Sequence, residues 1–377
     1  MADRSSLKIL HVLRAPVGGL FRHVLDLAKG QAERGHQVGI VAAQAAPDSP
    51  AHAKLGAITA NLTLGVHQIP MQRQVGLGDL TAVRHVGKVI ATCSPDVVHG
   101  HGAKGGAFAR MASTSGIRAY TPHGGSLHYG RWTPQGMVYG AIERVLMRRT
   151  DLLLFESKFA QQAYEFTIGK ATHTVRVVHN GVGADEFHPV EPGSQATDLV
   201  AIGELRHIKG IDVLIEAVAV LAAKGRPVSA TIVGQGPDEP SFRDLVVRHG
   251  LADRVRFAGY HPARQAFAFG RLLIVPSRAE SLPYIVLEAA AARVPMVTTN
   301  VGGIPEIFEA QHPLVAPGDV TALAAAVASA LDDLPAARAS AKRLQDRVHG
   351  LFSQDAMVDG ILTAYGESIR AKFHRSH

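Results

Sequence analysis

The sequence predicts an α/β protein with two domains, each built on a parallel β-sheet that helices cover on both faces. Short apolar runs alternate with helical patterns from end to end of the chain, and such βαβ alternation is typical of parallel sheets. The length of 377 residues is more than one ordinary hydrophobic core holds. A segment rich in Pro, Gly and polar residues, HPVEPGSQAT at 188–197, separates two similar halves. We therefore place one domain at 1–188 and the other at 189–351.

The first half contains apolar runs that predict six strands. They lie at 9–13, 38–43, 96–100, 118–121, 152–155 and 175–178. Between the first two runs, Leu20, Val24, Leu27 and Ala28 follow the spacing of one helix face. This is the pattern expected of a helix that connects two parallel strands.

The second half repeats the pattern. Its predicted strands lie at 199–202, 229–233, 255–258, 272–275 and 296–299. A helical stripe follows the first of them, made of Ile211, Leu214, Ile215, Val218 and Leu221. Residues 335–351 predict a polar helical connector, and residues 357–365 predict an amphipathic helix with no strand after it.

The composition is that of a soluble globular protein, with 46% hydrophobic and 19% charged residues. No run approaches the roughly 20 apolar residues that a membrane span needs. The first residues lead directly into a strand, so we expect no signal peptide. A lone Cys93 excludes an intramolecular disulfide and fits a reducing compartment. We therefore expect a cytoplasmic protein.

The net charge of +7 is compatible with nucleic acid, an anionic membrane face or phosphorylated small molecules as partners. The basic residues are scattered without a run of five or six, which argues against nucleic acid. The segment 131–149 combines apolar residues such as Trp132 and Val145 with Arg144, Arg148 and Arg149. It could contact an anionic membrane peripherally, although a helix packed on its own domain explains the pattern more simply.

The segment 276–288, PSRAESLPYIVLE, carries the most specific chemical signal. It follows an apolar run and leads into helix-forming residues, so it predicts strand, loop and helix, with Pro283 at the first helical turn. The unpaired amides of a helix start favour a phosphate. Glu280 precedes the helix and Glu288 lies about a turn and a half inside it. Together they could accept hydrogen bonds from sugar hydroxyls on both sides of a diphosphate, as in a nucleotide-sugar.

Two other glycine-containing loops follow predicted strands. Gly18 and Gly19 precede a helix, where glycines let the backbone approach a ligand and expose amides to anions, but a plain tight turn explains them equally well. Gly234 and Gly236 in VGQGP have Glu239 where a dinucleotide fingerprint needs a third glycine. A dinucleotide site is therefore not expected there.

The segment GELRHIKG at 203–210 places Arg206 and Lys209 three residues apart. Both could face one anion and absorb the charge of a phosphate leaving group, or both could be solvated surface charges. GGIPE at 302–306 repeats the arrangement of glycines before a helix, either to line a ligand or to form a turn.

Histidines gather at the ends of predicted strands in the first half. His99 and His101 lie two apart on a strand, so both should point to one face. They could begin a metal site, but no third ligand is evident, and core or surface histidines are the alternative. His123, in TPHGGS, lies just past a strand, where catalytic groups collect in such folds. A structural histidine is the alternative there.

Taken together, these segments resemble the retaining glycosyltransferases of family 4, which have the GT-B fold. The matching segments are GG at 18–19, DVVHGHG at 96–102, PHG at 122–124, HNGVGADEFHP at 179–189, GELRHIKG, VGQGP, VRFAGY at 255–260, PSRAESLPYIVLE and GGIPE. They follow the family's order over nearly the whole chain. The resemblance implies two Rossmann-like domains facing across a cleft, the first mainly binding the acceptor and the second the nucleotide. It also implies that a final helix, at about 352–377, crosses back to complete the first domain.

The resemblance also implies roles for the site residues. Glu288 would hold the ribose, and Glu280 the hydroxyls of the donor sugar. Arg206 and Lys209 would stabilise the departing nucleoside diphosphate, and His123 would lie beside the transferred sugar. The remaining donor contacts would come from Gly18, Gly19, Gly234, Gly236, Ser281, Leu282, Pro283, Tyr284 and Ile285. No metal or other cofactor is expected, because cationic side chains and helix dipoles stabilise the diphosphate.

One position departs from the family pattern. Many relatives have Arg directly after the glycine of the basic motif, whereas this chain has Glu204 there, with Arg206 two positions further on.

The function expected from these features is retaining transfer of a sugar from a nucleoside-diphosphate sugar to an acceptor hydroxyl, in polysaccharide or glycolipid assembly. The acceptor would be a saccharide or a lipid-linked saccharide, which would place the protein at the inner face of the membrane. A sugar-nucleotide epimerase or a phosphorylase of the same architecture is an alternative. A non-catalytic nucleotide-sugar sensor is another.

Overall fold

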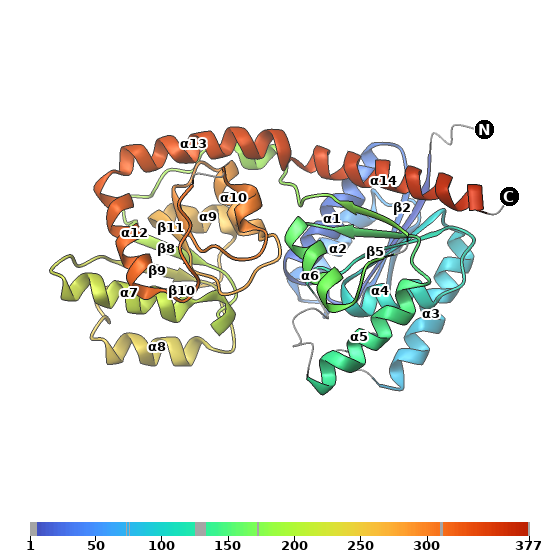
Figure 1. The fold of residues 1–377 in the computed structure, drawn as a ribbon, viewed down its shortest axis with the longest axis horizontal. Coiled ribbons are helices and arrows are strands. Elements are labelled where there is room, and N and C mark those ends of the chain that lie inside the picture. Colours follow the sequence, from blue (N-terminus) through green and yellow to red (C-terminus); the bar gives the residue numbers. More distant parts are fainter. Residues whose placement is uncertain are drawn as a thin grey trace. The chain divides into compact units, whose positions relative to one another are not determined.

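The structure is a computed structural model that describes residues 6–72, 74, 76–124, 133–171, 173–309 and 312–375. It divides into two compact units, which are Met1–Asn180 with Gln354–His377 (unit 1) and Gly181–Ser353 (unit 2). Each unit is a parallel β-sheet with helices against it (Figure 1). The expected α/β class is therefore confirmed. The chain passes from unit 1 to unit 2 eight residues before the expected boundary at 188.

Unit 1 has a seven-stranded parallel sheet in the order β3-β2-β1-β4-β5-β6-β7. Its strands are β1 Lys8–Leu13, β2 Gln37–Ala43, β3 Gly65–Ile69, β4 Val97–His101, β5 Ile117–Thr121, β6 Leu152–Phe155 and β7 Thr174–Val177. Strands β1 and β4 are neighbours in register, with His11 opposite His99 and Leu13 opposite His101. Their carboxyl ends therefore lie together at one edge of the sheet.

Helices cover both faces of this sheet. They are α1 Gly18–Glu33, α2 Pro50–Thr59, α3 Gly78–Cys93, α4 Gly102–Met111, α5 Pro134–Met147, α6 Lys158–Thr167 and α14 Gln354–Arg375. One face packs against α1, α2 and α14, and the other against α3, α4 and α6, because alternate residues of each strand point to opposite sides. Glycines let α4 approach closely, since a Cβ at Gly106 would overlap the ring of Tyr120.

The expected amphipathic helix near the end of the chain is α14. Its buried residues Met357, Val358, Ile361 and Tyr365 share one core with β1, β4, β5 and β6. Gly30 of α1 leaves room for this helix, because a Cβ there would overlap the side chain of Val358. The end of the chain thus completes the core of unit 1.

Unit 2 has a five-stranded parallel sheet in the order β10-β9-β8-β11-β12. Its strands are β8 Thr197–Ile202, β9 Ala230–Val233, β10 Val255–Gly259, β11 Gly270–Val275 and β12 Met296–Thr298. Its helices are α7 Ile211–Ala223, α8 Glu239–Arg248, α9 Ala263–Ala266, α10 Tyr284–Ala291, α11 Ile304–Ile307, α12 Val320–Asp332 and α13 Leu334–Leu351, with short 3-10 turns η2 Ala184–Phe187, η3 His207–Lys209 and η4 Phe267–Phe269. One core joins the sheet to α7, α8 and α12, and a second joins it to α9, α10, α11 and α13.

The expected strands are all present, with ends that differ from expectation by no more than two residues. The expected connector helix is α13. Strand β3, GVHQI, was not expected, because it is a half-buried edge strand with polar residues among its apolar ones. Within the described ranges, no single helix is long and apolar enough to span a membrane, and α12 with α13 reaches that length only across a bend of 99°.

Candidate functional site

The 276–288 segment forms the expected strand, loop and helix. Strand β11 ends at Val275 and α10 begins at Tyr284. Pro283 is the N-cap of α10, with φ −74° and ψ 125°, so it lies just before the first turn. Leu282 and Tyr284 bury their side chains in the core of unit 2. Glu288 lies on the second turn of α10, half-buried.

Glu280 and Lys209 form the centre of the site in unit 2. Lys209 Nζ donates a hydrogen bond of 2.6 Å to Glu280 Oε1, and Ser277 Oγ donates one of 2.7 Å to the same oxygen. The Glu280 side chain is only 9% exposed, and that of Lys209 30%. The pair forms because β8 and β11 are neighbouring parallel strands, so the loops that follow them meet at the same edge of the sheet.

Arg278 connects the loop that follows β11 to the loop that follows β8. Its backbone amide donates to the Ile208 carbonyl, and its guanidinium donates to both carboxylate oxygens of Asp212, at 2.7 and 2.6 Å. Burial would raise the pKa of Asp212, but the hydrogen bonds and charge of Arg278 outweigh it and hold that pKa below its usual value. Arg278 thus fixes the start of α7 next to the loop of Glu280. This residue was not among the expected site residues, although it lies inside the singled-out segment.

Glycines allow the loops of unit 2 to approach each other closely. Gly302 has φ +59°, and a Cβ there would overlap the carbonyl oxygen of Glu280. A Cβ at Gly234 would overlap the Gly203 carbonyl, and one at Gly236 the Leu205 carbonyl. Backbone packing therefore accounts for Gly234 and Gly236 without a ligand, while Gly302 holds the loop of Glu280 in place.

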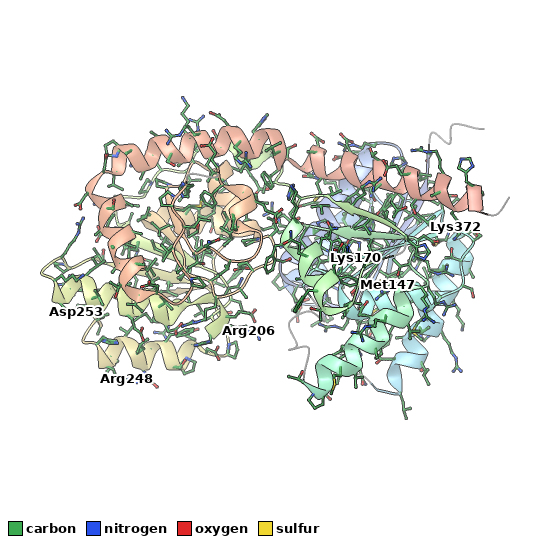
Figure 2. The ribbon with its side chains drawn as sticks, viewed as in Figure 1. Met147, Lys170, Arg206, Arg248, Asp253 and Lys372 are labelled. Atoms are coloured by element: carbon green, nitrogen blue, oxygen red, sulfur yellow. The ribbon has the colours of Figure 1, made fainter. Side chains whose placement is uncertain are left out.

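The side chain of Arg206 lies near a different carboxylate from that of Lys209. It precedes η3 and has half of its side chain exposed, with its guanidinium 3.9 Å from the carboxylate of Glu204. Figure 2 shows its side chain at the surface of unit 2. The two cations thus have different acidic partners.

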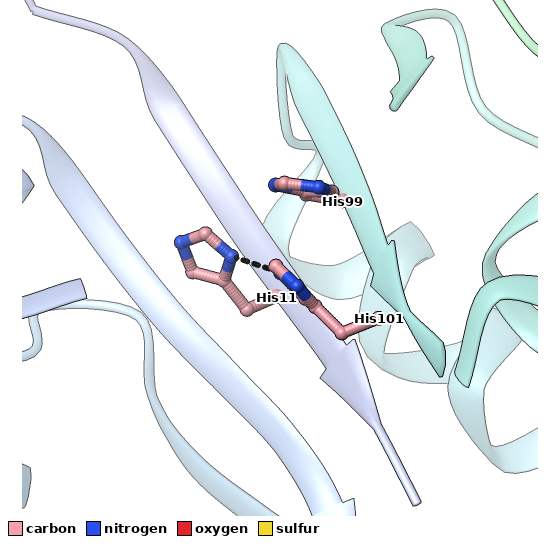
Figure 3. Close-up of side chains that lie close together, drawn as sticks. All are labelled: His11, His99 and His101. Atoms are coloured by element: carbon pink, nitrogen blue, oxygen red, sulfur yellow. Dashed lines mark hydrogen bonds between the residues drawn. The ribbon is translucent and has the colours of Figure 1, made fainter. Parts of the chain in front are cut away.

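A cluster of histidines in unit 1 lies around the carboxyl ends of β1 and β4. His99 and His101 point to one face as expected, with ring centroids 3.9 Å apart. They are joined by His11 of β1, whose Nδ1 lies 3.0 Å from His101 Nε2 (Figure 3). This hydrogen-bonded line continues from His11 Nε2 to Gln31 Oε1 at 2.9 Å, and from His101 Nδ1 to His123 Nε2 at 3.1 Å. Sequence reasoning missed His11, because a single histidine within an apolar strand is typical of a core residue.

Three further contacts fix the neighbouring rings. His99 lies between Tyr365 Oη, 2.7 Å from its Nδ1, and Thr121 Oγ1, 2.9 Å from its Nε2. The Nδ1 atom of His23, in α1, lies 3.0 Å from Asn180 Oδ1. His123 has φ +50° and follows β5.

Burial makes all five rings weak bases. It lowers the pKa of His11 to about 4 and that of His123 to about 3. It also places the pKa values of His23, His99 and His101 well below the usual range, with the neighbouring histidines adding to the effect. The cluster is therefore a set of neutral imidazoles at neutral pH.

Gly18 and Gly19 form the exposed start of α1. Gly18 has φ +69°, a conformation that favours glycine, and no atom lies within 4 Å of the position that a Cβ would take. The turn thus explains Gly18, and the space beside it is open.

Two family models match the chain. The model described as Glycosyltransferase Family 4 matches residues 17–186, and the model described as Glycosyl transferases group 1 matches residues 196–333. The chain belongs to glycosyltransferase family 4. The first match lies mostly in unit 1 and includes all of the clustered histidines except His11. The second lies in unit 2, with the pair of Lys209 and Glu280.

Two relatives align with most of the length of this glycosyltransferase. It is 26% identical to a glycogen synthase of Mycobacterium tuberculosis, over 93% of this chain and 91% of the relative. It is 23% identical to the gpi3 subunit of a phosphatidylinositol N-acetylglucosaminyltransferase of Schizosaccharomyces pombe, over 89% of this chain and 75% of the relative.

Solved structures share the fold of this glycosyltransferase. HepE of Anabaena, in complex with UDP, superposes with a TM-score of 0.78 at 20% identity, over 96% of this chain and all of that one. Sucrose-phosphate synthase of Thermosynechococcus elongatus gives 0.81 at 20% identity, over 98% of this chain and all of that one. The expected GT-B fold class, with two Rossmann-like sheets, is confirmed.

Helix α5 of this glycosyltransferase has two different faces. Its inner face is anchored by a buried ion pair, in which Arg110 donates two hydrogen bonds to the carboxylate of Glu143. Its outer face exposes 44–62% of the surface of four apolar residues, Met137, Val138, Ile142 and Val145. Arg131 and Trp132, part of the expected membrane-contacting segment, lie outside the described residues.

Proposed function

We propose that this glycosyltransferase is a retaining enzyme that moves a sugar from a nucleoside-diphosphate sugar to an acceptor hydroxyl without a bound metal ion. One observation carries the proposal: Lys209 Nζ lies 2.6 Å from Glu280 Oε1, directly before the start of α10. A cation, a carboxylate and a helix start thus meet at the ends of β8 and β11. Such a set can hold the phosphates and the sugar hydroxyls of one donor.

In the proposed reaction, the bond between the anomeric carbon and the diphosphate oxygen breaks while the acceptor oxygen bonds to the same face of that carbon. Lys209 and the dipole of α10 stabilise the charge that develops on the departing nucleoside diphosphate, with Arg206 as a second cation. The diphosphate takes the proton of the acceptor hydroxyl, so no separate base is needed.

The remaining residues are proposed to position the donor. Glu280 accepts hydrogen bonds from hydroxyls of the donor sugar, and Glu288 from those of the ribose. The backbone of residues 281–285 binds the diphosphate, and His123 contacts the transferred sugar. The glycines at 18–19 let the backbone approach the donor, for which the open space beside Gly18 gives support.

The donor nucleotide is the first point to test. HepE of Anabaena was crystallised with UDP and with UDP-glucose, so UDP-sugars come first in the screen, followed by GDP and ADP with their sugars. A ligand that binds only the folded chain raises its melting temperature. The nucleotide that gives the largest rise is then used with radiolabelled sugar in a transfer assay.

Two substitutions test the site. Glu280→Gln and Lys209→Ala should each lower turnover about 10²-fold, the scale of losing one preorganised stabilising group. Glu191→Gln and Lys224→Ala change exposed residues of unit 2 and serve as controls. Near-normal turnover in both site variants would overturn the assignment.

An incubation without acceptor separates this reaction from the alternatives of the same architecture. An epimerase would interconvert two sugar nucleotides, and a phosphorylase would require inorganic phosphate. A nucleotide-sugar sensor would bind donor without any turnover. A transferase should show only slow hydrolysis until an acceptor is added.

We further propose that the acceptor is a saccharide or lipid-linked saccharide, in polysaccharide or glycolipid assembly at the cytoplasmic face of a membrane. The outer face of α5 supports this, because its exposed apolar residues are followed at the end of the helix by two exposed cations, Arg148 and Arg149. Exposed apolar residues with cations beside them are the combination that anionic lipid surfaces attract.

A further inference from the structure

Two groups of three histidines among the described residues bring their ring nitrogens within 4.8 Å of one another. One is His11, His99 and His101, and the other is His23, His101 and His123. In the first group, both nitrogens of His99 are engaged, one by Thr121 and one by Tyr365. All three rings of that group are fully buried. An ion there would have to break several hydrogen bonds in a closed core, which disfavours the first group.

The second group has hydrogen-bond acceptors behind two of its rings. Asn180 Oδ1 faces His23 Nδ1 at 3.0 Å, which places the proton of the neutral ring on Nδ1 and its lone pair on Nε2. His101 Nε2 faces His11 Nδ1, and His11 Nε2 faces Gln31 Oε1. Because Gln31 Oε1 can only accept, His11 Nε2 donates to it, and His11 Nδ1 then accepts from His101 Nε2. The lone pair of the neutral His101 ring is therefore on Nδ1. Metal-bound histidines typically donate their other N–H to such an acceptor, which fixes tautomer and ring orientation.

The rings of the second group also lie close to one another. Their centroids are 4.8 Å apart for His23 and His123, 5.4 Å for His101 and His123, and 5.7 Å for His23 and His101. Burial keeps all three rings neutral by lowering their pKa values, and the neutral imidazole is the form that binds metals. His123 retains some exposed surface and so provides a route to solvent.

We propose that His23, His101 and His123 form a binding site for a divalent transition-metal ion, for which Zn²⁺ is suited by its preference for imidazole nitrogen. The ligand atoms would be His23 Nε2, His101 Nδ1 and His123 Nε2, with the fourth tetrahedral position left to water. The ion replaces the hydrogen that His101 Nδ1 and His123 Nε2 share. The proton of His123 moves to its Nδ1, so three neutral rings bind the ion and no proton is released.

The consequence for catalysis is inhibition. This part rests on the proposed function, in which His123 contacts the transferred sugar. An ion bound through His123 Nε2 would hold that ring away from the sugar. The transfer reaction itself needs no metal, so a chelator should leave the turnover of the zinc-free protein unchanged. After zinc has been added and has lowered turnover, the same chelator should restore it.

Binding is tested on the whole chain without any sugar nucleotide, so its result does not depend on transferase activity. Chelator-treated protein is titrated with Zn²⁺ in a calorimeter and with Co²⁺ in an absorption spectrometer. One site with micromolar or tighter affinity is expected, with the strong visible bands of four-coordinate Co²⁺. Since the chain has 20 histidines, each variant below is needed to locate the site.

His23→Gln and His123→Asn should each weaken Zn²⁺ binding at least tenfold. Asparagine is chosen at 123 because it tolerates the left-handed backbone found there. Asn180→Leu removes only the acceptor behind His23 and should weaken binding about tenfold, the lower end of the effect of such partners. His99→Gln is the matched control, since His99 is buried in the same cluster but belongs only to the first group.

The proposal is overturned if no stoichiometric ion binds, or if His123→Asn binds zinc as tightly as the unchanged chain. It is also overturned if His99→Gln, with a normal melting temperature, is the variant that loses the ion. If one ion binds per chain but turnover is unaffected, the proposed site stands and the proposed inhibition is refuted.

Discussion

Glu280 Oε1 accepts hydrogen bonds from both Lys209 and Ser277, so the carboxylate is held in position before any donor arrives. Lys209 and Glu280 should therefore act as a unit. The double variant Lys209→Ala with Glu280→Gln should lose clearly less turnover than the product of the two single losses, because each single change already disturbs the remaining partner. Steady-state kcat/KM values of the unchanged chain, the two single variants and the double variant give the coupling between the two residues. Strictly multiplicative losses would contradict it.

Gly302→Ala should damage the site more than the fold. The new Cβ would overlap the carbonyl oxygen of Glu280 and push the loop of that residue away from Lys209. Gly318→Ala is a matched control, since its φ of +79° is also left-handed but no atom lies within 4 Å of its Cβ position. Both variants should lose about 1 kcal/mol of stability from backbone strain. Only Gly302→Ala should also lose at least tenfold in kcat/KM, and equal kinetics would refute the role of Gly302.

The buried pair of Arg110 and Glu143 should be costly to break from one side only. Arg110→Met leaves the Glu143 carboxylate buried with the Tyr120 hydroxyl as its remaining neutral partner, and we expect a loss of about 3–5 kcal/mol in the free energy of unfolding. Arg110→Met with Glu143→Leu should recover much of that loss, because no charge is then left buried. Denaturant titrations measure both. A loss below about 1 kcal/mol in the single variant would contradict this account.

The histidine cluster should make the metal-free protein sensitive to acid. The unfolded chain binds protons near pH 6.5, whereas the folded pKa values are about 4 for His11 and about 3 for His123. As pH falls below 6.5 the unfolded state gains protons first, so stability falls by up to about 1.4 kcal/mol per pH unit for each such histidine. The loss for His11 ends near pH 4. Burial lowers both pKa values, and for His11 the hydrogen bond with Gln31 opposes part of that effect. The groups around the rings are the other histidines and the amides of Gln31 and Asn180.

The measurement is urea unfolding in the presence of a chelator between pH 7.5 and 4.5. His11→Gln should show a smaller decline over that range than the unchanged chain, whatever its stability at pH 7.5. A flat profile for the unchanged chain would contradict the burial of neutral rings.

Contact with an anionic membrane can be tested by flotation with vesicles. The protein should float with vesicles that contain phosphatidylserine at low salt and not with neutral ones. Val138→Glu with Val145→Glu should abolish flotation, because both residues lie on the outer face of α5. Val247→Glu, at a somewhat more exposed position on α8, is the control and should float normally. Absence of flotation by the unchanged chain removes the membrane proposal.

Local features of the site could be predicted from sequence because they depend on neighbours along the chain. Pro283, the apolar run before it and the helix formers after it predict strand, loop and helix without any knowledge of the fold. The contact between Lys209 and Glu280, 71 residues apart, could not be derived from periodicity. It depends on β8 and β11 being neighbours in the sheet, and the periodicity of apolar residues does not specify strand order.

The same limit explains the histidines. His99 and His101 were visible as a pair because they are two apart on one strand, whereas His11 and His23 come from β1 and α1. Only the pairing of β1 with β4 and the packing of α1 bring these rings together. Asp212 and Arg278 were missed for a related reason, since a bidentate pair between two loops leaves no mark in either loop alone.

Helix α14 has a consequence for biosynthesis. Unit 1 begins to emerge from the ribosome first, yet residues such as Met357, Ile361 and Tyr365 must be translated before one of its cores is complete. Residues 181–353, made in between, already contain every strand and helix of unit 2. The half of the protein that is synthesised first is therefore the half that is completed last, and the part of its sheet that α14 covers stays open to chaperones during the interval.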